Sequence, residues 1–247
     1  MLDPAPTFFS YSSSRSVSCW WVTDLSGNPS TRYPLSVSRT TVSCAALTAL
    51  SSSIDIVCYL ASLGSPPPWR MEVEKYEALT DELTFSKRDR ILDIGCGTGR
   101  SLVGIAPAVP PTCTTVGLDP FDDRIILGNA PGLARRNARN AGLDASVVRG
   151  DGTRLPVSDD SMDVVTACRM LHDLSATAAN RTLSEAHRVC RPDGRLGVLE
   201  LPITHVESSN PTEYWCERVS DAGFDIAVVE ELDLNDKRYV VIIGEPR

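Results

Sequence analysis

The 247-residue chain has little positive charge for its length. It contains 24 Lys and Arg against 32 Asp and Glu, a formal net charge of −8, and residues 71–247 include only three lysines: Lys75, Lys87 and Lys237. A protein that binds a phosphate backbone normally needs a basic patch. The one local cluster of arginines, within residues 135–139, is typical of the solvated face of a helix. The composition therefore gives no strong signal for nucleic acid.

Long apolar runs, clustered cysteines and a basic N-terminal start are also missing. A membrane-spanning helix needs roughly 20 mostly apolar residues, and the best window, Val42–Leu63, is broken by Ser51–Ser53 and Asp55. We therefore expect no membrane span, and Met1–Pro4 offers no basic start for a secretory signal. The eight cysteines include no C-x-x-C pair after residue 71. Because structural zinc usually needs clustered ligand pairs, we expect no metal, free thiols and a reducing, cytoplasmic location.

Composition divides the chain near Arg70. Residues 1–70 are rich in serine, carry only seven charged residues and contain no Lys or Glu, which argues against an independently folded domain. Residues 71–247 carry 20 basic and 29 acidic residues and suit one α/β domain with a sizeable core. We interpret residues 1–70 as a leader, either a disordered extension or a start assigned too early. The change in composition favours the second interpretation, with Met71 as the first residue.

The most informative stretch is Arg90–Arg100, where a strand pattern leads through three glycines into a helix pattern. Such a turn brings backbone N–H groups at a helix N-terminus close to a ligand. The dinucleotide fingerprint is G-x-G-x-x-G, but here Gly95, Gly97 and Gly99 alternate, and an arginine occupies the third fingerprint position. A carboxylate at Asp93 would repel a pyrophosphate and can pair with a cationic ligand. The spacing therefore disfavours a dinucleotide.

Alternating strand and helix patterns follow the glycines, which implies a parallel sheet with right-handed crossovers. A second strand ends in Asp119, 20 residues past Gly99, and an acid at that distance can accept both hydroxyls of a ribose. A third strand is followed by Asp151 in a loop. The expected elements are a helix over residues 73–85, strands over 114–119, from 146 and over 161–168, a helix, turn and strand over 183–196, a helix over 211–221, and strands over 226–230 and 239–243.

The motif D-x-G-x-G-x-G from Asp93 to Gly99, with the order of these elements, resembles the class I S-adenosylmethionine-dependent methyltransferases, in particular the ubiquinone/menaquinone-biosynthesis type. The resemblance extends from about Glu72 to Pro246. It implies an α/β fold, with a Rossmann-like, seven-stranded, mostly parallel sheet, a C-terminal antiparallel hairpin and helices on both faces. It also implies S-adenosyl-L-methionine as cofactor and methyl transfer to an unidentified small-molecule acceptor.

The same resemblance assigns cofactor-binding residues. The glycine loop would wrap the methionine moiety, the acid after the second strand would hold the ribose, and the acid after the third strand, or the amide beside it, would hold the adenine amino group. Within the loop, we interpret Cys96 as a small residue that fits rather than as a nucleophile. The assigned residues are Asp93, Gly95, Cys96, Gly97, Gly99, Asp119, Pro120, Asp151, Gly152 and Arg169.

The candidate catalytic residues, His172 and Asp173, follow the fourth strand at its carboxyl edge, where ligands bind in open α/β sheets. Methyl transfer is a displacement at a sulfonium, so positioning supplies much of the barrier reduction and at most one general base is needed. His172 can deprotonate a hydroxyl, an amine or an acidic carbon near neutral pH; alternatively, it packs against or caps the following loop. Glu200 is a further candidate, and Tyr214 and Trp215 either line a substrate pocket or belong to the core.

Three functions remain open at this point. The first is a methyltransferase that acts on a small molecule. The second is an NAD(P)-dependent oxidoreductase, which Asp93 and the missing third fingerprint glycine disfavour. The third is a non-catalytic cofactor-binding relative, because a fold and a loop alone do not establish turnover.

Overall fold

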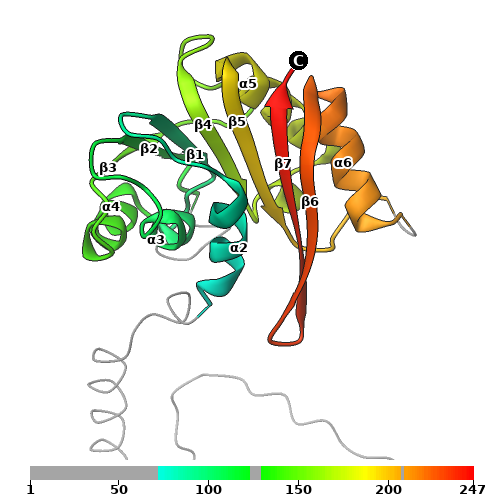
Figure 1. Ribbon diagram of the computed structural model, residues 1–247, viewed down its shortest axis with the longest axis horizontal. Coiled ribbons are helices and arrows are strands. Elements are labelled where there is room, and N and C mark those ends of the chain that lie inside the picture. The colour runs from blue at the N-terminus through cyan, green and yellow to red at the C-terminus, as the bar shows by residue number, and fades with distance from the viewer. Residues whose placement is uncertain (1–71, 123–128, 207–208) are drawn as a thin grey trace, which may run out of the picture. The chain divides into compact units, whose positions relative to one another are not determined.

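The computed structural model describes residues 72–122, 129–206 and 209–247, so the expected leader lies outside the described residues. The described residues contain seven strands: β1 (Arg90–Ile94), β2 (Thr114–Asp119), β3 (Ala145–Arg149), β4 (Met162–Cys168), β5 (Cys190–Glu200), β6 (Phe224–Leu234) and β7 (Lys237–Pro246). They form one sheet in the order β3-β2-β1-β4-β5-β7-β6 (Figure 1). Neighbours among β1 to β5 are parallel, and β7 is antiparallel to β5 and β6. The expected seven-stranded sheet with a C-terminal antiparallel hairpin is confirmed.

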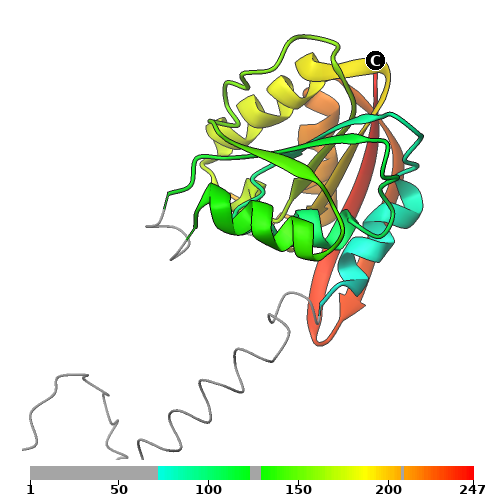
Figure 2. The same cartoon turned by 90° about the vertical axis from the view of Figure 1, so that its left-hand side faces the viewer.

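Helices cover both faces of this sheet, as expected (Figure 2). In the described residues they are α2 (Glu74–Glu82), α3 (Arg100–Ile105), α4 (Pro131–Asn140), the short 3₁₀ helix η2 (Leu171–Asp173), α5 (Ala176–Val189) and α6 (Pro211–Asp221). Successive strand residues point to opposite faces. In β1, Ile91 joins the apolar cluster beneath α2, α3 and α4, whereas Leu92 joins the cluster beneath α5 and α6. The sheet therefore has a separate core on each side.

The boundaries of α6 and α2 show how neighbouring residues determine where a helix begins and ends. α6 spans the expected residues, because Asn210 accepts hydrogen bonds at Oδ1 from the N–H groups of Thr212 and Glu213 and thereby caps the helix. α2 is shorter than the expected 73–85. It ends at Glu82, and Leu83 turns to an extended conformation. Leu83 is still buried, so the apolar pattern continues while the helix does not.

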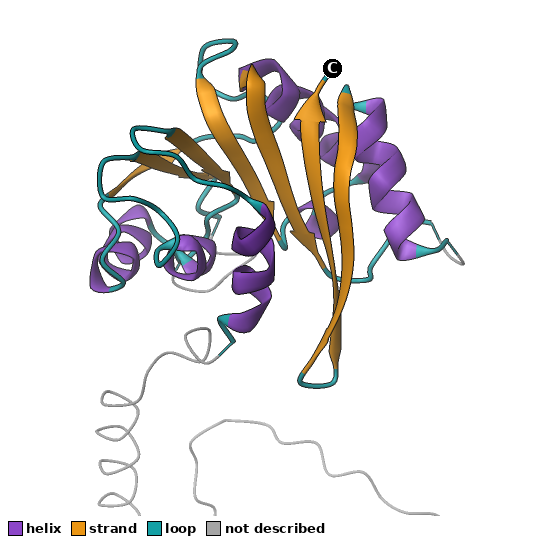
Figure 3. Cartoon of the chain, in the orientation of Figure 1, coloured by secondary structure: helices purple, strands orange, loops and turns teal. Residues whose placement is uncertain are grey.

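The C-terminal hairpin is longer than expected (Figure 3). The sequence predicts a loop over residues 233–237, but β6 and β7 continue to a turn of two residues, Asn235 and Asp236, with φ of 51° and 61°. Two successive positive φ values match the twist of a tight hairpin, and Asn and Asp tolerate them best among non-glycine residues. Pairing between β6 and β7 extends to Leu234 and Lys237, beyond the last β5–β7 pair. The hairpin tip therefore projects past the carboxyl end of β5.

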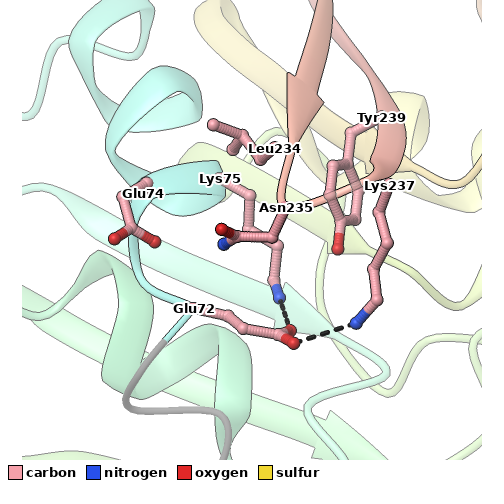
Figure 4. Close-up of a pocket in the computed structure, with 7 residues that line it drawn as sticks. All are labelled: Glu72, Glu74, Lys75, Leu234, Asn235, Lys237 and Tyr239. Atoms are coloured by element: carbon pink, nitrogen blue, oxygen red, sulfur yellow. Dashed lines mark hydrogen bonds and ion pairs between the residues drawn. The ribbon is translucent and has the colours of Figure 1, made fainter.

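An ion-pair cluster joins α2 to this tip (Figure 4). The carboxylate of Glu72 lies 2.6 Å from Nζ of Lys75 and 2.9 Å from Nζ of Lys237. These two hydrogen bonds lower the pKa of Glu72 to about 2, whereas burial lowers the pKa of Lys75. The Lys75 ammonium also lies 5.4 Å from the ring centre of Tyr239. The cavity between these side chains measures about 10 Å³, the space of a single water molecule. The cluster therefore holds α2 against the hairpin and is not a ligand site.

The strand order reverses between β1 and β4, and this reversal positions the site. The chain moves from β1 outward through β2 and β3, and then returns to the other side of β1 as β4. Ile94 pairs with Ala167, so the carboxyl ends of β1 and β4 lie side by side. In open α/β sheets this is where ligands bind. The glycine loop after β1 therefore faces the segment after β4.

The contact between α2 and α3 gives a testable prediction. A Cβ on Gly104 would lie 2.2 Å from the Tyr76 ring, so we expect Gly104→Ala to displace α2 and lower the free energy of unfolding by about 1–3 kcal/mol. A Cβ on Gly132 in α4 meets no described heavy atom within 4 Å. Gly132→Ala should therefore leave the free energy unchanged or raise it by up to about 1 kcal/mol. Urea unfolding measures the free energy of both variants. Equal changes in the two variants would contradict the close contact between Gly104 and Tyr76.

Candidate active site

The glycine loop has the backbone conformation that its sequence predicts. Gly95, Gly97 and Gly99 have φ of 74°, 52° and 87°, the left-handed region that glycine enters without steric cost. The N–H of Gly95 donates to the carbonyl of Leu118 at 2.7 Å, and the N–H of Gly99 donates to the carbonyl of Cys96 at 2.7 Å. The loop is therefore a compact turn fastened to the end of β2.

Two of these glycines also permit close approach. A Cβ on Gly99 would lie 2.8 Å from the carbonyl oxygen of Ala134 in α4, and a Cβ on Gly95 would lie 2.7 Å from the Met170 side chain. Asn137 of α4 donates to the carbonyl of Thr98 at 2.8 Å. The absence of side chains thus lets α4 brace the loop from one side and the segment after β4 approach from the other.

Asp119 at the end of β2 holds the loop in place. Its Oδ2 accepts the N–H of Gly97 at 3.0 Å, and its Oδ1 accepts the N–H of Phe121 at 2.6 Å and the Asn129 amide at 3.0 Å. The carboxylate is buried. The assignment of Asp119 to a ribose stays a prediction. In the structure its carboxylate fixes the backbone of the glycine loop.

Asp93 lies beneath the site instead of on its surface. It is fully buried, and its carboxylate accepts the hydroxyls of Ser101 at 2.5 Å and Thr166 at 2.8 Å. Burial raises the pKa of Asp93 to about 7, against the two hydroxyl hydrogen bonds that lower it. The sequence suggested direct pairing with a cationic ligand, but in the structure Ser101 stands between Asp93 and the cleft. Asp93 can therefore influence a ligand only through Ser101 and its charge.

A cleft of about 210 Å³ opens between the glycine loop and the segment after β4. It brings together four of the assigned cofactor residues, both catalytic candidates and a side chain of α2. Its walls consist of Tyr76, Gly95, Cys96, Gly97, Thr98, Arg100, Ser101, Cys168, Arg169, His172 and Asp173.

A smaller, mainly apolar cavity of about 50 Å³ adjoins the cleft at Gly95. It contains Pro120, Asp151 and Gly152, which the resemblance assigns to the nucleoside end of the cofactor. The full lining is Ile94, Gly95, Leu118, Pro120, Asp151, Gly152, Thr153, Met170, Leu174 and Thr182. Asp93, Gly99 and Asp119 line neither cavity and support the residues that do.

The cleft wall contains polar atoms without partners. Among the described residues, Oγ1 of Thr98 and Nε of Arg169 are buried and accept or donate no hydrogen bond. Arg169 also has a φ of 56°, and its N–H donates to the carbonyl of Leu199 at 2.6 Å. Leaving a buried polar atom unpaired costs about 1–3 kcal/mol. Their position in the wall therefore fits a polar ligand that supplies the missing partners.

His172 is paired with the fully buried Glu200. Nδ1 of His172 lies 2.5 Å from Oε2 of Glu200, whose Oε1 accepts the N–H groups of Met170 and Leu171 at 2.9 and 2.7 Å. Because a carboxylate only accepts, Nδ1 carries a proton, and in the neutral imidazole Nε2, which lies 3.5 Å from Oδ1 of Asp173, keeps a lone pair. Burial lowers the pKa of His172, but the hydrogen bond and charge of Glu200, with Asp173, outweigh it and raise the pKa. Both residues were separate sequence candidates; the structure makes them a dyad.

Other site residues carried no sequence signal. Tyr76, Thr98 and Ser101 line the cleft. An aromatic at helical spacing, a threonine in a loop and a serine at the start of α3 are common in any domain, so their residue types alone do not indicate a site. Tyr214 and Trp215 are buried in the core, so the core alternative for them is correct.

The cysteines in the described residues, Cys96, Cys113, Cys168, Cys190 and Cys216, are free. Burial raises the pKa of Cys96, so its thiol stays protonated and is a poor nucleophile. Across residues 72–122, 129–206 and 209–247, no group of three His, Cys, Asp or Glu side chains is placed to hold a metal ion. No helix in the same ranges is long and apolar enough to cross a membrane.

Comparisons with known proteins agree with this geometry. Residues 91–194 match the family model described as a methyltransferase domain. The chain is 34% identical over 181 residues to a demethylmenaquinone methyltransferase of Beutenbergia cavernae, which covers 65% of this chain and 67% of that protein. It is 32% identical over 155 residues to a demethylmenaquinone methyltransferase of Lactobacillus johnsonii, of which it spans 58%, with 62% of this chain covered.

A solved structure shows the same fold. A SAM-dependent methyltransferase from Aquifex aeolicus superposes with a TM-score of 0.55 at 20% identity, and the match covers 72% of this chain and 93% of that one. At that identity the likeness concerns the fold and not the substrate.

The buried carboxyl of Asp93 gives a prediction about stability and pH. Its pKa is about 7 in the folded chain against 3.8 in an exposed side chain, so the folded state binds more protons between these values. The free energy of unfolding of the wild type, relative to Asp93→Asn, should therefore fall as pH rises from about 4 to 7. Thermal unfolding across this range measures the difference. The exposed Asp144→Asn is the control, and a difference that does not change with pH would contradict the burial argument.

Proposed function

The chain belongs to the class I S-adenosylmethionine-dependent methyltransferases, and we propose that it transfers the methyl group of S-adenosylmethionine to a small quinone-type acceptor, with His172 as general base. The observation that carries the proposal is the His172–Glu200 pair in the wall of the cleft formed by the glycine loop. The family membership removes the support for an NAD(P)-dependent oxidoreductase.

The residues present fit the cofactor. S-adenosylmethionine supplies a methyl group on a sulfonium sulfur, which is a good leaving group. The unpaired Nε of Arg169 and Oγ1 of Thr98 suit the carboxylate and ammonium of its methionine end. The smaller apolar cavity, with Asp151 at its wall, suits an adenine ring whose amino group needs an acceptor. Pro120 lies in the same cavity, directly after Asp119, the acid assigned to the ribose.

His172 supplies the proton transfer in this proposal. Glu200 holds the proton on Nδ1, so Nε2 is the atom that accepts a proton from an acceptor hydroxyl. Loss of that proton would raise the electron density on the oxygen and on the neighbouring ring carbon, which is the property that a methyl acceptor needs. The charge of Glu200 stabilises the imidazolium that results.

The acceptor class rests on the relatives and on this chemistry. Two relatives bear the name demethylmenaquinone methyltransferase, and a reduced quinone has the acidic hydroxyl that a histidine base needs. The chain spans less than two thirds of the Lactobacillus protein, so the acceptor is a proposal for this chain. A measured methyl transfer to such a quinol distinguishes an enzyme from a non-catalytic relative.

Cofactor binding gives the first prediction. We expect calorimetric titration of the full chain to show saturable binding of S-adenosylmethionine and no binding of NAD. Gly97→Ala should weaken binding at least about tenfold, because the φ of 52° disfavours any side chain by roughly 1–2 kcal/mol and the loop must then shift. Gly142→Ala, at φ 88° with no described heavy atom within 4 Å, is the matched control. If both variants bind S-adenosylmethionine with the same affinity, the glycine loop is not part of the cofactor site.

The pH dependence of turnover gives the second. With a demethylated naphthoquinol, kcat/KM should rise with pH through the pKa of His172, above its ordinary value of 6.5. His172→Gln should lower kcat by about 10²–10⁴ without changing the Kd of S-adenosylmethionine. Glu200→Gln should lower kcat and move the rising limb to lower pH, because the charge that raises the pKa is gone. His187→Gln is the control. If the rising limb of the pH profile stays at the same pH in Glu200→Gln, the coupling between His172 and Glu200 is refuted.

A further inference from the structure

The segment that follows Glu200, residues 201–206, exposes two large apolar side chains at the carboxyl edge of the sheet. Ile203 and Val206 expose 47% and 51% of their surface. Among the described residues the other large apolar side chains with comparable exposure are Val148 and Val229, which lie singly on β3 and β6. Exposed apolar side chains that cluster close to a site mark a contact surface more often than isolated ones do.

His205 ties this segment to the turn that carries His172. Its Nε2 lies 2.7 Å from the carbonyl oxygen of Leu174, and its Nδ1 lies 2.6 Å from the hydroxyl of Tyr214. Since the carbonyl only accepts, Nε2 donates, and Nδ1 accepts the hydroxyl proton of Tyr214. Leu174 directly follows η2 and lines the smaller cavity. His205 therefore links three elements: the segment, the start of α6 and the end of the catalytic turn.

The segment is also anchored from below. Trp215, fully buried in α6, donates from Nε1 to the carbonyl of Ile203 at 3.1 Å, and its ring packs edge-on against that of His205 at 5.6 Å. Glu200 holds the beginning of the turn at Met170, while His205 holds its end. The apolar segment and the catalytic turn are therefore fixed to each other at two points.

We propose that residues 201–206 form the acceptor-binding wall of the site. Ile203 and Val206 contact the apolar part of an acceptor that combines an aromatic ring with a hydrocarbon chain, and His205 is the positioning residue that fixes this wall to the turn of His172. The proposal rests on the proposed function and deepens it. The cleft itself is lined largely by glycines and polar side chains, so the hydrocarbon part of the acceptor finds its apolar contact on the neighbouring segment.

Binding of two naphthoquinones tests the wall. Equilibrium dialysis of the full chain with 2-geranyl-1,4-naphthoquinone and with 1,4-naphthoquinone compares a ring with and without a chain. We expect Ile203→Ser/Val206→Ser to weaken binding of the geranyl compound on the order of tenfold and to leave the unprenylated ring nearly unaffected. Val229→Ser, at an exposed valine of β6, is the control. Wild-type affinity of the double variant for the geranyl compound would overturn the proposal.

Variants of His205 test the positioning role. His205→Ala should raise the KM for the acceptor and lower kcat several-fold, with the Kd of S-adenosylmethionine unchanged. His205→Gln, which retains a donor toward Leu174, should restore most of both. If His205→Ala instead weakens cofactor binding and stability together and glutamine restores nothing, the positioning role is wrong. Failure of the chain to bind S-adenosylmethionine would refute the proposed function. Because dialysis needs no turnover, the naphthoquinone result would still decide whether residues 201–206 bind the acceptor.

Discussion

The buried carboxylate of Glu200 is the interaction on which the arrangement of the site depends. A carboxylate without solvent is costly unless hydrogen bonds replace its water. Here three consecutive residues, Met170, Leu171 and His172, supply them. The requirement to satisfy one buried charge therefore sets the path of the chain after β4. Because Glu200 ends a central strand, the rigidity of the sheet passes directly to the imidazole.

The same principle operates at two other strands. Asp119 at the end of β2 accepts the N–H of Gly97, and Asp93 in β1 accepts the hydroxyls of Ser101 and Thr166. Acids that a motif would assign to a ligand thus also hold the walls of the ligand site together. Substituting any of them changes binding and local structure at once, so the effects of such substitutions do not add independently.

The sequence predicts what depends on local chemistry. The glycine spacing, the alternation of strands and helices and the bounds of α6 are all set by neighbouring residues, and they lie where expected. Pairing of His172 with Glu200 depends on the register between β4 and β5, which no local pattern specifies. The position of Asp93 depends on which face of β1 it takes, and the long hairpin depends on two residues that accept positive φ. The pairing and the position of Asp93 arise from the assembled sheet, so only the structure could show them, whereas the long hairpin follows from a local turn signal that the expected loop missed.

The contacts between α2 and the C-terminal hairpin affect the order in which the domain assembles. Glu72 and Lys237 are 165 residues apart, and α2 packs on β5, β6 and β7, where Gly197 makes room for Leu83 and Leu79. During synthesis the helix that carries Tyr76 emerges before these three strands, although α3, its other neighbour, follows it closely. Contacts of such separation form slowly, and until they form the part of α2 that packs on the strands stays uncovered. One wall of the cleft is thus complete only when the C-terminal hairpin has folded, so a nascent chain has the glycine loop well before it has a closed site.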